Sequence, residues 1–263
     1  MQDRGLAAYI AELIGTLLLV FGICSAVTLY VSTSPEAQTG SDFVLVGFVH
    51  ALFLFGVIIS FGQVSGGHFN PVVTLAAAVM RRIDPIDALV YVLAQLSGGV
   101  LGALLVRGIL PAPGEASNYG AASISDIIPS SFAGFAVEAL GTFFLVAVIC
   151  AVAFNPRARQ DWAPLAIGTT LGVAAMIAAP LTGAAFNPAR WFGPALIGNS
   201  FGSFADIWPY VLGPIVGSLL GVGVYRFVIA GPQFSEGPEP PTSDAASAER
   251  AIKDAEVRAR QSG

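Results

Sequence analysis

Six long apolar stretches constrain the fold of this chain more than any other feature. Each is close to the ~20 apolar residues that an α-helix needs to cross the hydrocarbon core of a bilayer. Charged residues make up only 11% of the chain and apolar residues 55%, whereas a typical soluble domain has roughly 25% charged residues. We therefore predict an all-α integral membrane protein with transmembrane helices at about 7–30, 43–64, 85–109, 132–154, 163–182 and 207–230.

Two further apolar segments, at about 69–79 and 187–198, are too short to cross the bilayer. Each opens with Asn-Pro. Asn as the N-cap followed by Pro at the first helical position is a typical start of a helix. We therefore predict two short helices that begin abruptly inside the protein.

The basic residues are distributed asymmetrically. The loops at about 31–42, 110–131 and 199–206 contain no Lys or Arg, and only Arg107 lies at the edge of this side. By the positive-inside rule, this asymmetry predicts a multi-pass protein of the cell membrane with both termini in the cytoplasm. The cytoplasmic side of a six-span topology would carry Arg4, Arg81, Arg82, Arg157, Arg159, Arg226, Arg250, Lys253, Arg258 and Arg260.

The last segment, 231–263, differs in composition from the rest and holds 10 of the 29 charged residues. Its Pro, Ser and Glu content predicts a disordered cytoplasmic tail, with a short charged helix near its end as the alternative. The net charge of −5 without a basic stripe argues against a nucleic-acid partner. Cys24 and Cys150 lie inside apolar runs without metal-ligand spacing, so we expect small packing residues and no metal or cofactor.

Three motifs of the first half recur in the same order in the second half. AELIGTLLLVFGIC at 11–24 aligns without gaps to VEALGTFFLVAVIC at 137–150, with 7 of 14 positions identical. Three matches in register indicate an internal repeat. The other two matches are SGGHFNPVV with TGAAFNPAR, at 65–73 and 182–190, and GVLGALL with PIVGSLL, at 99–105 and 214–220.

Each half, at about 7–109 and 132–230, contains three spans and one short Asn-Pro helix. Because three is odd, the second half enters from the opposite side of the membrane, which predicts an inverted 3+3 repeat. The two short helices then meet N-terminus to N-terminus near the midplane. Non-helical backbone at that depth is tolerated only if it lines a water-filled cavity or is buried in protein, so the pattern favours a pore.

These features resemble the aquaporin (major intrinsic protein) family. The resemblance covers about 7–230 and rests on HFNPVVT at 68–74, FNPARWFGPA at 186–195 and the duplicated Glu-x-x-Gly-Thr. It implies a channel domain over 1–230 and a homotetramer with a pore in each protomer. The pore-centre motifs would be Asn70, Pro71 and Val72, which depart from the usual Asn-Pro-Ala, and Asn187, Pro188 and Ala189.

The chemistry of these motifs suggests how such a pore would exclude charge. Each Asn caps its helix while an amide N–H can donate to a solute oxygen, and both positive helix ends point at the centre, against cations and protons. By resemblance, carbonyls of 66–68 and 184–186 would supply acceptors along the path. Glu12 and Glu138 lie inside spans, where ionisable groups are costly and usually functional.

Two interpretations of these glutamates are open. Their duplication favours a bracing role, in which each accepts hydrogen bonds from the extended backbone beside a short helix; the alternative is a proton relay. His68 is expected to be a buried brace and not a metal ligand, because no second ligand is spaced with it.

A selectivity filter is also implied by position in the family motifs. It would consist of His50, Ala175, Ala184 and Arg190, with Arg190 at the extracellular constriction. Two alanines beside His50 and Arg190 suggest a wider opening than a strict water filter. Trp191, where the family usually has a small residue or Asp, does not discriminate between water and glycerol channels. Tyr210-Val211 is closer to the nodulin-like branch, whereas Ala195 is typical of water channels.

We therefore expect a passive channel for water and small uncharged solutes that excludes ions and protons. The main alternative is an ion- or proton-coupled secondary transporter, which also uses inverted repeats and broken helices. An intramembrane enzyme would need a nucleophile and base pair or a metal cluster, and two histidines without such spacing argue against it.

Overall fold

The computed structural model describes residues 5–31 and 40–230, and every regular element within them is helical. Six of its helices are long and apolar enough to cross a membrane, which confirms the predicted all-α membrane fold. The tail at 231–263 lies outside the described residues. The long helices are α1 Gly5–Tyr30, α2 Gly40–Ser65, α4 Pro85–Ile109, α6 Ser131–Ile149, α7 Ala163–Thr182 and α9 Phe204–Val224.

Shorter elements complete the described part of the chain. The two predicted short helices are confirmed as α3, Pro71–Val79, and α8, Pro188–Ile197. Sequence analysis did not foresee that α6 and α9 continue into π-helical turns. The remaining short elements are α5 Pro111–Ala116, η1 Asn118–Gly120, η2 Cys150–Phe154, η3 Gln160–Trp162 and η4 Tyr225–Ile229.

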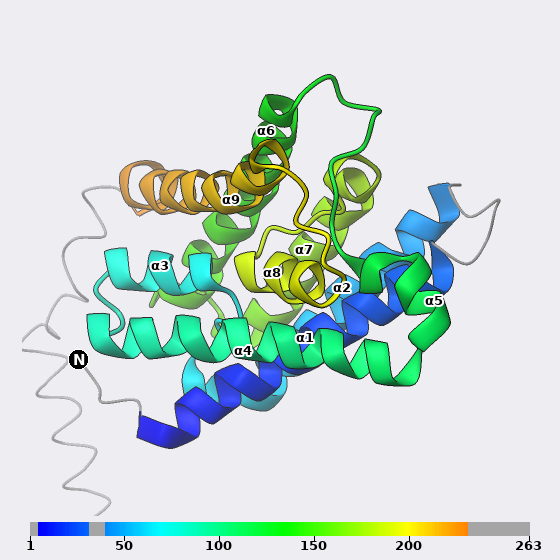
Figure 1. Ribbon diagram of the computed structural model, residues 1–263. Coiled ribbons are helices and arrows are strands. Elements are labelled where there is room, and N and C mark those ends of the chain that lie inside the picture. Colours follow the sequence, from blue (N-terminus) through cyan, green and yellow to red (C-terminus); the bar gives the residue numbers. More distant parts are fainter. Residues whose placement is uncertain (1–4, 32–39, 231–263) are drawn as a thin grey trace, which may run out of the picture.

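The long helices pack in the same way in both halves. Helix α1 packs along α4 in the first half and α6 along α9 in the second, while α2 packs against α7 across the two halves (Figure 1). Each short helix also packs against the third span of the other half, α8 on α4 and α3 on α9. The two halves are therefore interlocked through the short helices, as an inverted repeat requires.

The N-terminus of each short helix is held by its predicted asparagine. Asn70 has extended backbone, and its side-chain oxygen accepts a hydrogen bond from the N–H of Val72 at 3.1 Å. The side-chain oxygen of Asn187 accepts from the N–H groups of Ala189, at 2.9 Å, and Arg190, at 3.3 Å. These caps satisfy backbone donors that the start of a helix leaves unpaired.

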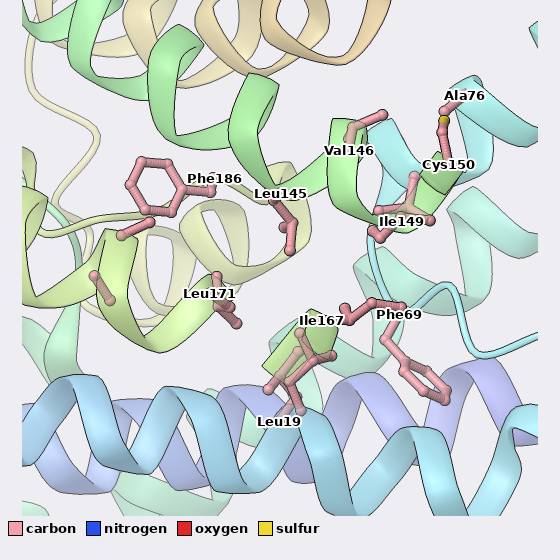
Figure 2. Close-up of a cluster of buried hydrophobic side chains, with 14 of the residues drawn as sticks. Leu19, Phe69, Ala76, Leu145, Val146, Ile149, Cys150, Ile167, Leu171 and Phe186 are labelled. Carbon is pink, nitrogen blue, oxygen red and sulfur yellow. The ribbon is translucent and has the colours of Figure 1, made fainter. Parts of the chain in front are cut away.

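A buried apolar cluster lies where the two halves meet. It combines Leu19 of α1 and Leu145 of α6 with Phe69 and Phe186, which directly precede the two capping asparagines (Figure 2). Both phenylalanine side chains are fully buried. Each ring packs on a glycine of the duplicated Glu-x-x-Gly-Thr motif, Phe69 on Gly15 and Phe186 on the second copy. The repeated sequence motifs therefore make the same phenylalanine–glycine contact in both halves.

The paired helices approach closely at glycines that the third repeated motif supplies. A Cβ added at Gly217 of α9 would lie 2.2 Å from the carbonyl oxygen of Ala139 in α6. At the matching position, a Cβ at Gly102 of α4 would lie 2.6 Å from the carbonyl oxygen of Leu17 in α1. Small residues of this kind let membrane helices pack backbone against backbone.

We predict that Gly217→Ala destabilises the protein, because the added methyl group must push α9 away from α6. Overpacking of this kind costs about 1–3 kcal/mol. The midpoint of thermal unfolding of the purified protein in detergent measures the effect. Gly223→Ala on the same helix is the matched control, since a Cβ there meets no atom within 4 Å. Equal midpoints for the two variants would contradict the close packing of α6 and α9.

Candidate functional site

A cavity of about 460 Å³ runs between the two halves. Its lining includes His50 of α2, both capping asparagines, and Arg190 of α8. At its other end it is lined by residues of η2, η3 and the start of α7, including Asp161. Some of the expected site residues from both halves thus line one continuous space.

The two asparagines bind each other's segments across the pseudo-two-fold axis. The Asn70 amide nitrogen donates to the carbonyl oxygen of Phe186 at 2.9 Å, and the Asn187 amide nitrogen donates to that of Phe69 at 2.8 Å. Each amide carries two hydrogens, so one N–H per asparagine is left for another acceptor. The Phe186 carbonyl, expected to serve solute along the path, accepts one of these protein hydrogen bonds.

The segments leading to the asparagines are not uniformly extended. Phe69, Ala184 and Phe186 have φ of 48°, 48° and 49°, a left-handed conformation that is costly for residues with a Cβ. Such strain persists only where the surrounding structure over-determines it. Here the surrounding structure includes two buried carboxylates, one from α1 and one from α6, that each bind one segment.

Glu12 holds the first segment with four hydrogen bonds. Its carboxylate accepts from the backbone N–H of His68, at 2.9 Å, and of Phe69, at 2.6 Å. It also accepts from the Ser65 hydroxyl at 2.6 Å and from the Gln95 amide at 2.7 Å. The side chain is fully buried, and its acceptor capacity is directed at the non-helical backbone and its neighbours.

Glu138 holds the second segment in the same way. Its carboxylate accepts from the backbone N–H of Ala185 at 3.0 Å and of Phe186 at 2.7 Å, and from the Thr182 hydroxyl at 2.6 Å. Ser65 and Thr182 occupy the first position of the aligned motifs SGGHFNPVV and TGAAFNPAR. Sequence analysis did not single out this hydroxyl pair, although the alignment itself contained the signal.

The first half adds a polar network that sequence analysis mostly missed. The Thr74 hydroxyl donates to the Asn70 carbonyl at 3.3 Å and accepts from the Gln95 amide at 2.9 Å. Because that hydroxyl proton is used, Nδ1 of His68 donates to Thr74 at 3.1 Å. His68 therefore lies in a buried network beside the cavity, with Gln95 joining it to Glu12.

The second half fills the aligned positions with apolar and aromatic side chains. Ala185, Trp191 and Tyr210 replace the three members of the polar network. Trp191 stacks on Tyr210 with ring centroids 5.7 Å apart, contacts Phe201 edge-on, and is buried. The Tyr210 hydroxyl donates to the Thr182 carbonyl at 2.7 Å. Trp191 is thus a packing residue of the second half, outside the described lining of the cavity.

Val72, the departure from the usual motif, lies at an asymmetric contact. Its carbonyl oxygen accepts from the hydroxyl of Ser218 in α9 at 2.7 Å. On the other side of the axis, Gly99 of α4 approaches the carbonyl oxygen of Ala189 so closely that a Cβ would lie 2.4 Å from it. One short helix is therefore bridged to its neighbour by a hydroxyl, and the other packs directly on a glycine.

The structure brings only half of the expected filter side chains to the cavity. Its described lining includes His50 and Arg190, but neither Ala175 nor Ala184. Both alanines are fully buried and belong to the apolar cluster between the halves. The wider opening expected from these alanines therefore has no counterpart in the described lining.

His50 and Arg190 present complementary groups. Nδ1 of His50 donates to the Val46 carbonyl at 2.8 Å, so Nε2 of the neutral ring is an acceptor. Nη1 of Arg190 donates to the Gly120 carbonyl at 3.0 Å. Nε2 of His50 and Nε of Arg190 are both buried without a hydrogen-bond partner in the described part of the protein. His50 therefore has an acceptor, and Arg190 a charged donor group, that no hydrogen bond within the described residues occupies.

Comparisons with known proteins agree with this geometry. The sequence matches the family profile described as "Major intrinsic protein" over residues 2–225. This chain belongs to the major intrinsic protein family. It is 35% identical to Nodulin-26 of Glycine max over 90% of this chain and 82% of that protein. It is 36% identical to the glycerol uptake facilitator protein-like 6 of Lactiplantibacillus plantarum, over 81% and 93%.

A solved structure supports the same fold for this major intrinsic protein. The aquaglyceroporin from Plasmodium falciparum superposes with a TM-score of 0.75, at 23% identity, over 88% of this chain and 98% of that one. At this level of identity the likeness concerns the fold alone. The six spans and two short helices therefore form the aquaporin fold predicted from the sequence.

We predict that Glu12→Gln is milder than Glu12→Ala. The amide oxygen of Gln still accepts a hydrogen bond, whereas Ala leaves the buried donors of His68 and Phe69 unpaired. A buried donor without a partner costs roughly 1–3 kcal/mol, so the Ala variant should have the lower yield and unfolding midpoint. Normal stability combined with a large transport defect in the Gln variant would instead support the proton-relay interpretation.

Proposed function

We propose that this major intrinsic protein is a passive channel for water and small uncharged solutes and that it excludes ions and protons. The single observation that carries the proposal is the reciprocal pair of bonds from Asn70 to Phe186 and from Asn187 to Phe69. These bonds hold two helix N-termini beside one continuous cavity, with one N–H of each amide still available. The family of the chain supports the same function.

Charge exclusion follows from the same arrangement. Each helix N-terminus carries a partial positive charge, and the two act together on the middle of the cavity. A cation entering this field is repelled, as at other channel constrictions built from half-helix ends. A water molecule that accepts hydrogen bonds from both amides has its oxygen lone pairs occupied, which opposes proton transfer along a file of waters.

Recognition of solute would involve His50 and Arg190. Hydroxyl and amide groups both donate and accept, so they can bond to the His50 acceptor and the guanidinium donors together. The fixed positive charge of Arg190 would repel cations a second time. One relative is named glycerol uptake facilitator protein-like 6, which supports including small polyols among the solutes.

The coupled-transporter alternative is disfavoured by the two buried glutamates. A coupled transporter needs a carboxylate that binds and releases a proton or ion during each cycle. Glu12 and Glu138 instead accept backbone and hydroxyl hydrogen bonds from the segments that they brace. Releasing either carboxylate would leave buried backbone donors unpaired. We infer a protein that conducts without chemistry and is not an enzyme.

The proposal includes topology and assembly. Arg82 donates to the Phe154 carbonyl and lies over its ring, so the loop after α3 meets the end of η2 at one end of the bundle. The loops at 110–130 and 198–203, at the other end, contain no Lys or Arg. By the positive-inside rule we propose a cell-membrane protein with both termini in the cytoplasm. Family membership supports a homotetramer.

Stopped-flow light scattering of proteoliposomes tests the proposed function. Fluxes of water, glycerol and urea are measured with and without a proton gradient, and with and without a membrane potential. We expect a water permeability well above that of empty liposomes, with no dependence on potential. Transport that follows the proton gradient or the potential would support the transporter instead.

We predict that Asn70→Asp and Asn187→Asp weaken charge exclusion. A carboxylate places negative charge beside the two helix N-termini and removes the amide donor that binds the opposite segment. Cation or proton leak in proteoliposomes should rise while the protein still assembles. Leu104→Asn on the exposed face of α4 is a control for the presence of a new polar group in a span. Unchanged ion exclusion in well-assembled Asp variants would contradict the assignment of the pore centre.

A further inference from the structure

The segment that links the two halves is tied to several helices near Arg190. The Ser117 hydroxyl shares a 2.9 Å hydrogen bond with the hydroxyl of Thr28 in α1. The Ser125 N–H donates to the Leu181 carbonyl of α7 at 2.9 Å. The linker between α4 and α6 is therefore a fixed part of the structure around the cavity.

Three consecutive residues of this linker have a left-handed backbone. Asn118, Tyr119 and Gly120 have φ of 49°, 54° and 73°. Glycine at the third position is favoured by its φ and required by the close approach to α1. Its φ disfavours any side chain, and a Cβ would lie 2.7 Å from Cα and 2.8 Å from the carbonyl oxygen of Cys24 in α1. The turn therefore sets the linker backbone directly against the backbone of α1.

The carbonyl oxygen of Gly120 is the point where three elements meet. It accepts a hydrogen bond from Nη1 of Arg190 in α8 at 3.0 Å. The thiol of Cys24 in α1 points at the same oxygen, with Sγ 3.9 Å away. Cys24 is fully buried, and in the sequence it looked like a packing residue only. In the structure it also contacts the carbonyl group that binds Arg190.

We propose that Cys24 and Gly120 are positioning residues that hold the Arg190 guanidinium against the wall of the channel and thereby determine its conductance and selectivity. The proposal rests on the proposed function, in which Arg190 faces the solute. The left-handed turn aims the carbonyl, the contact with Cys24 fixes the distance of the turn from α1, and the charge-assisted hydrogen bond fixes the guanidinium.

Loss of this hydrogen bond has a defined consequence. A released guanidinium keeps its charge and needs a new acceptor. His50 lines the same cavity, and its acceptor Nε2 is buried without a hydrogen-bond partner among the described residues. A guanidinium that turns toward His50 enters the path of the solute. Permeability should then fall, and it should fall more for glycerol than for water.

The first test compares Gly120→Ala with Gly202→Ala. Gly202 also has positive φ, 67°, and lies in another loop, where the three atoms nearest to an added Cβ all belong to the side chain of Asp206. Gly120→Ala should lower water permeability per assembled channel by roughly tenfold, the order expected for loss of a hydrogen bond to a charged group. Gly202→Ala should retain the wild-type value.

The second test uses the repeat to supply a matched control. Cys24 and Cys150 are aligned positions of the two halves, and both are fully buried. Cys24→Val replaces the thiol donor by a branched apolar side chain beside Gly120 and should lower permeability in the same sense as Gly120→Ala. Cys150→Val has no contact with the Gly120 carbonyl and should leave permeability unchanged. This arm also tests the proposal if Gly120→Ala does not assemble.

A double variant separates positioning from a general structural defect. If the released guanidinium blocks the path by binding His50, then adding His50→Ala to Gly120→Ala should restore most of the water permeability. A structural defect would not be repaired by removing a second side chain. All permeabilities are normalised to protein that elutes and unfolds like the wild type.

The outcomes for the two proposals are distinct. A wild-type protein that conducts no water contradicts the proposed function. A conducting wild type whose Gly120→Ala and Cys24→Val variants behave like their controls contradicts the positioning role alone. Failure of His50→Ala to restore permeability in the Gly120→Ala background also counts against it.

Discussion

Two stretches of non-helical backbone near the middle of a membrane are the constraint on which this structure depends. In the bilayer core every backbone donor and acceptor must find a partner within the protein. Glu12 and Glu138 supply acceptors to the donors on the two segments, and the two asparagines join the segments to each other. Without these bonds the buried backbone donors would lack partners, and the short helices could not begin inside the bundle.

The two halves satisfy this constraint with different surroundings. In the first, His68, Thr74 and Gln95 form a buried polar network around the carboxylate. In the second, the aligned positions form an aromatic stack in which Trp191 packs on Tyr210. The repeat therefore preserves the bonds to the backbone, whereas the side chains behind them differ. The two halves can therefore share the same backbone hydrogen bonds while the side chains around them differ.

The linker between the halves also contributes to the surroundings of the cavity. It belongs to neither repeat, yet its Gly120 carbonyl accepts a hydrogen bond from the Arg190 guanidinium. His50 and Arg190, which line the cavity, are therefore held by backbone carbonyls of α2 and of the linker. In our proposal a substitution at Cys24, which lies 166 positions from Arg190 along the chain, acts on the guanidinium through the Gly120 carbonyl oxygen.

The sequence by itself determined the spans, the short helices, the inverted repeat and the bracing candidates. Hydrophobic length and the Asn-Pro starts are local signals, and the duplicated motifs align without any structure. The tertiary structure decided which groups share space: the partnership of Gln95 with Glu12, the stacking of Trp191 away from the cavity, and the burial of Ala175 and Ala184. It also decided the meeting of Cys24 and Arg190 at Gly120. Such pairings join residues up to 166 positions apart along the chain, and they depend on how helices pack, which no local pattern encodes.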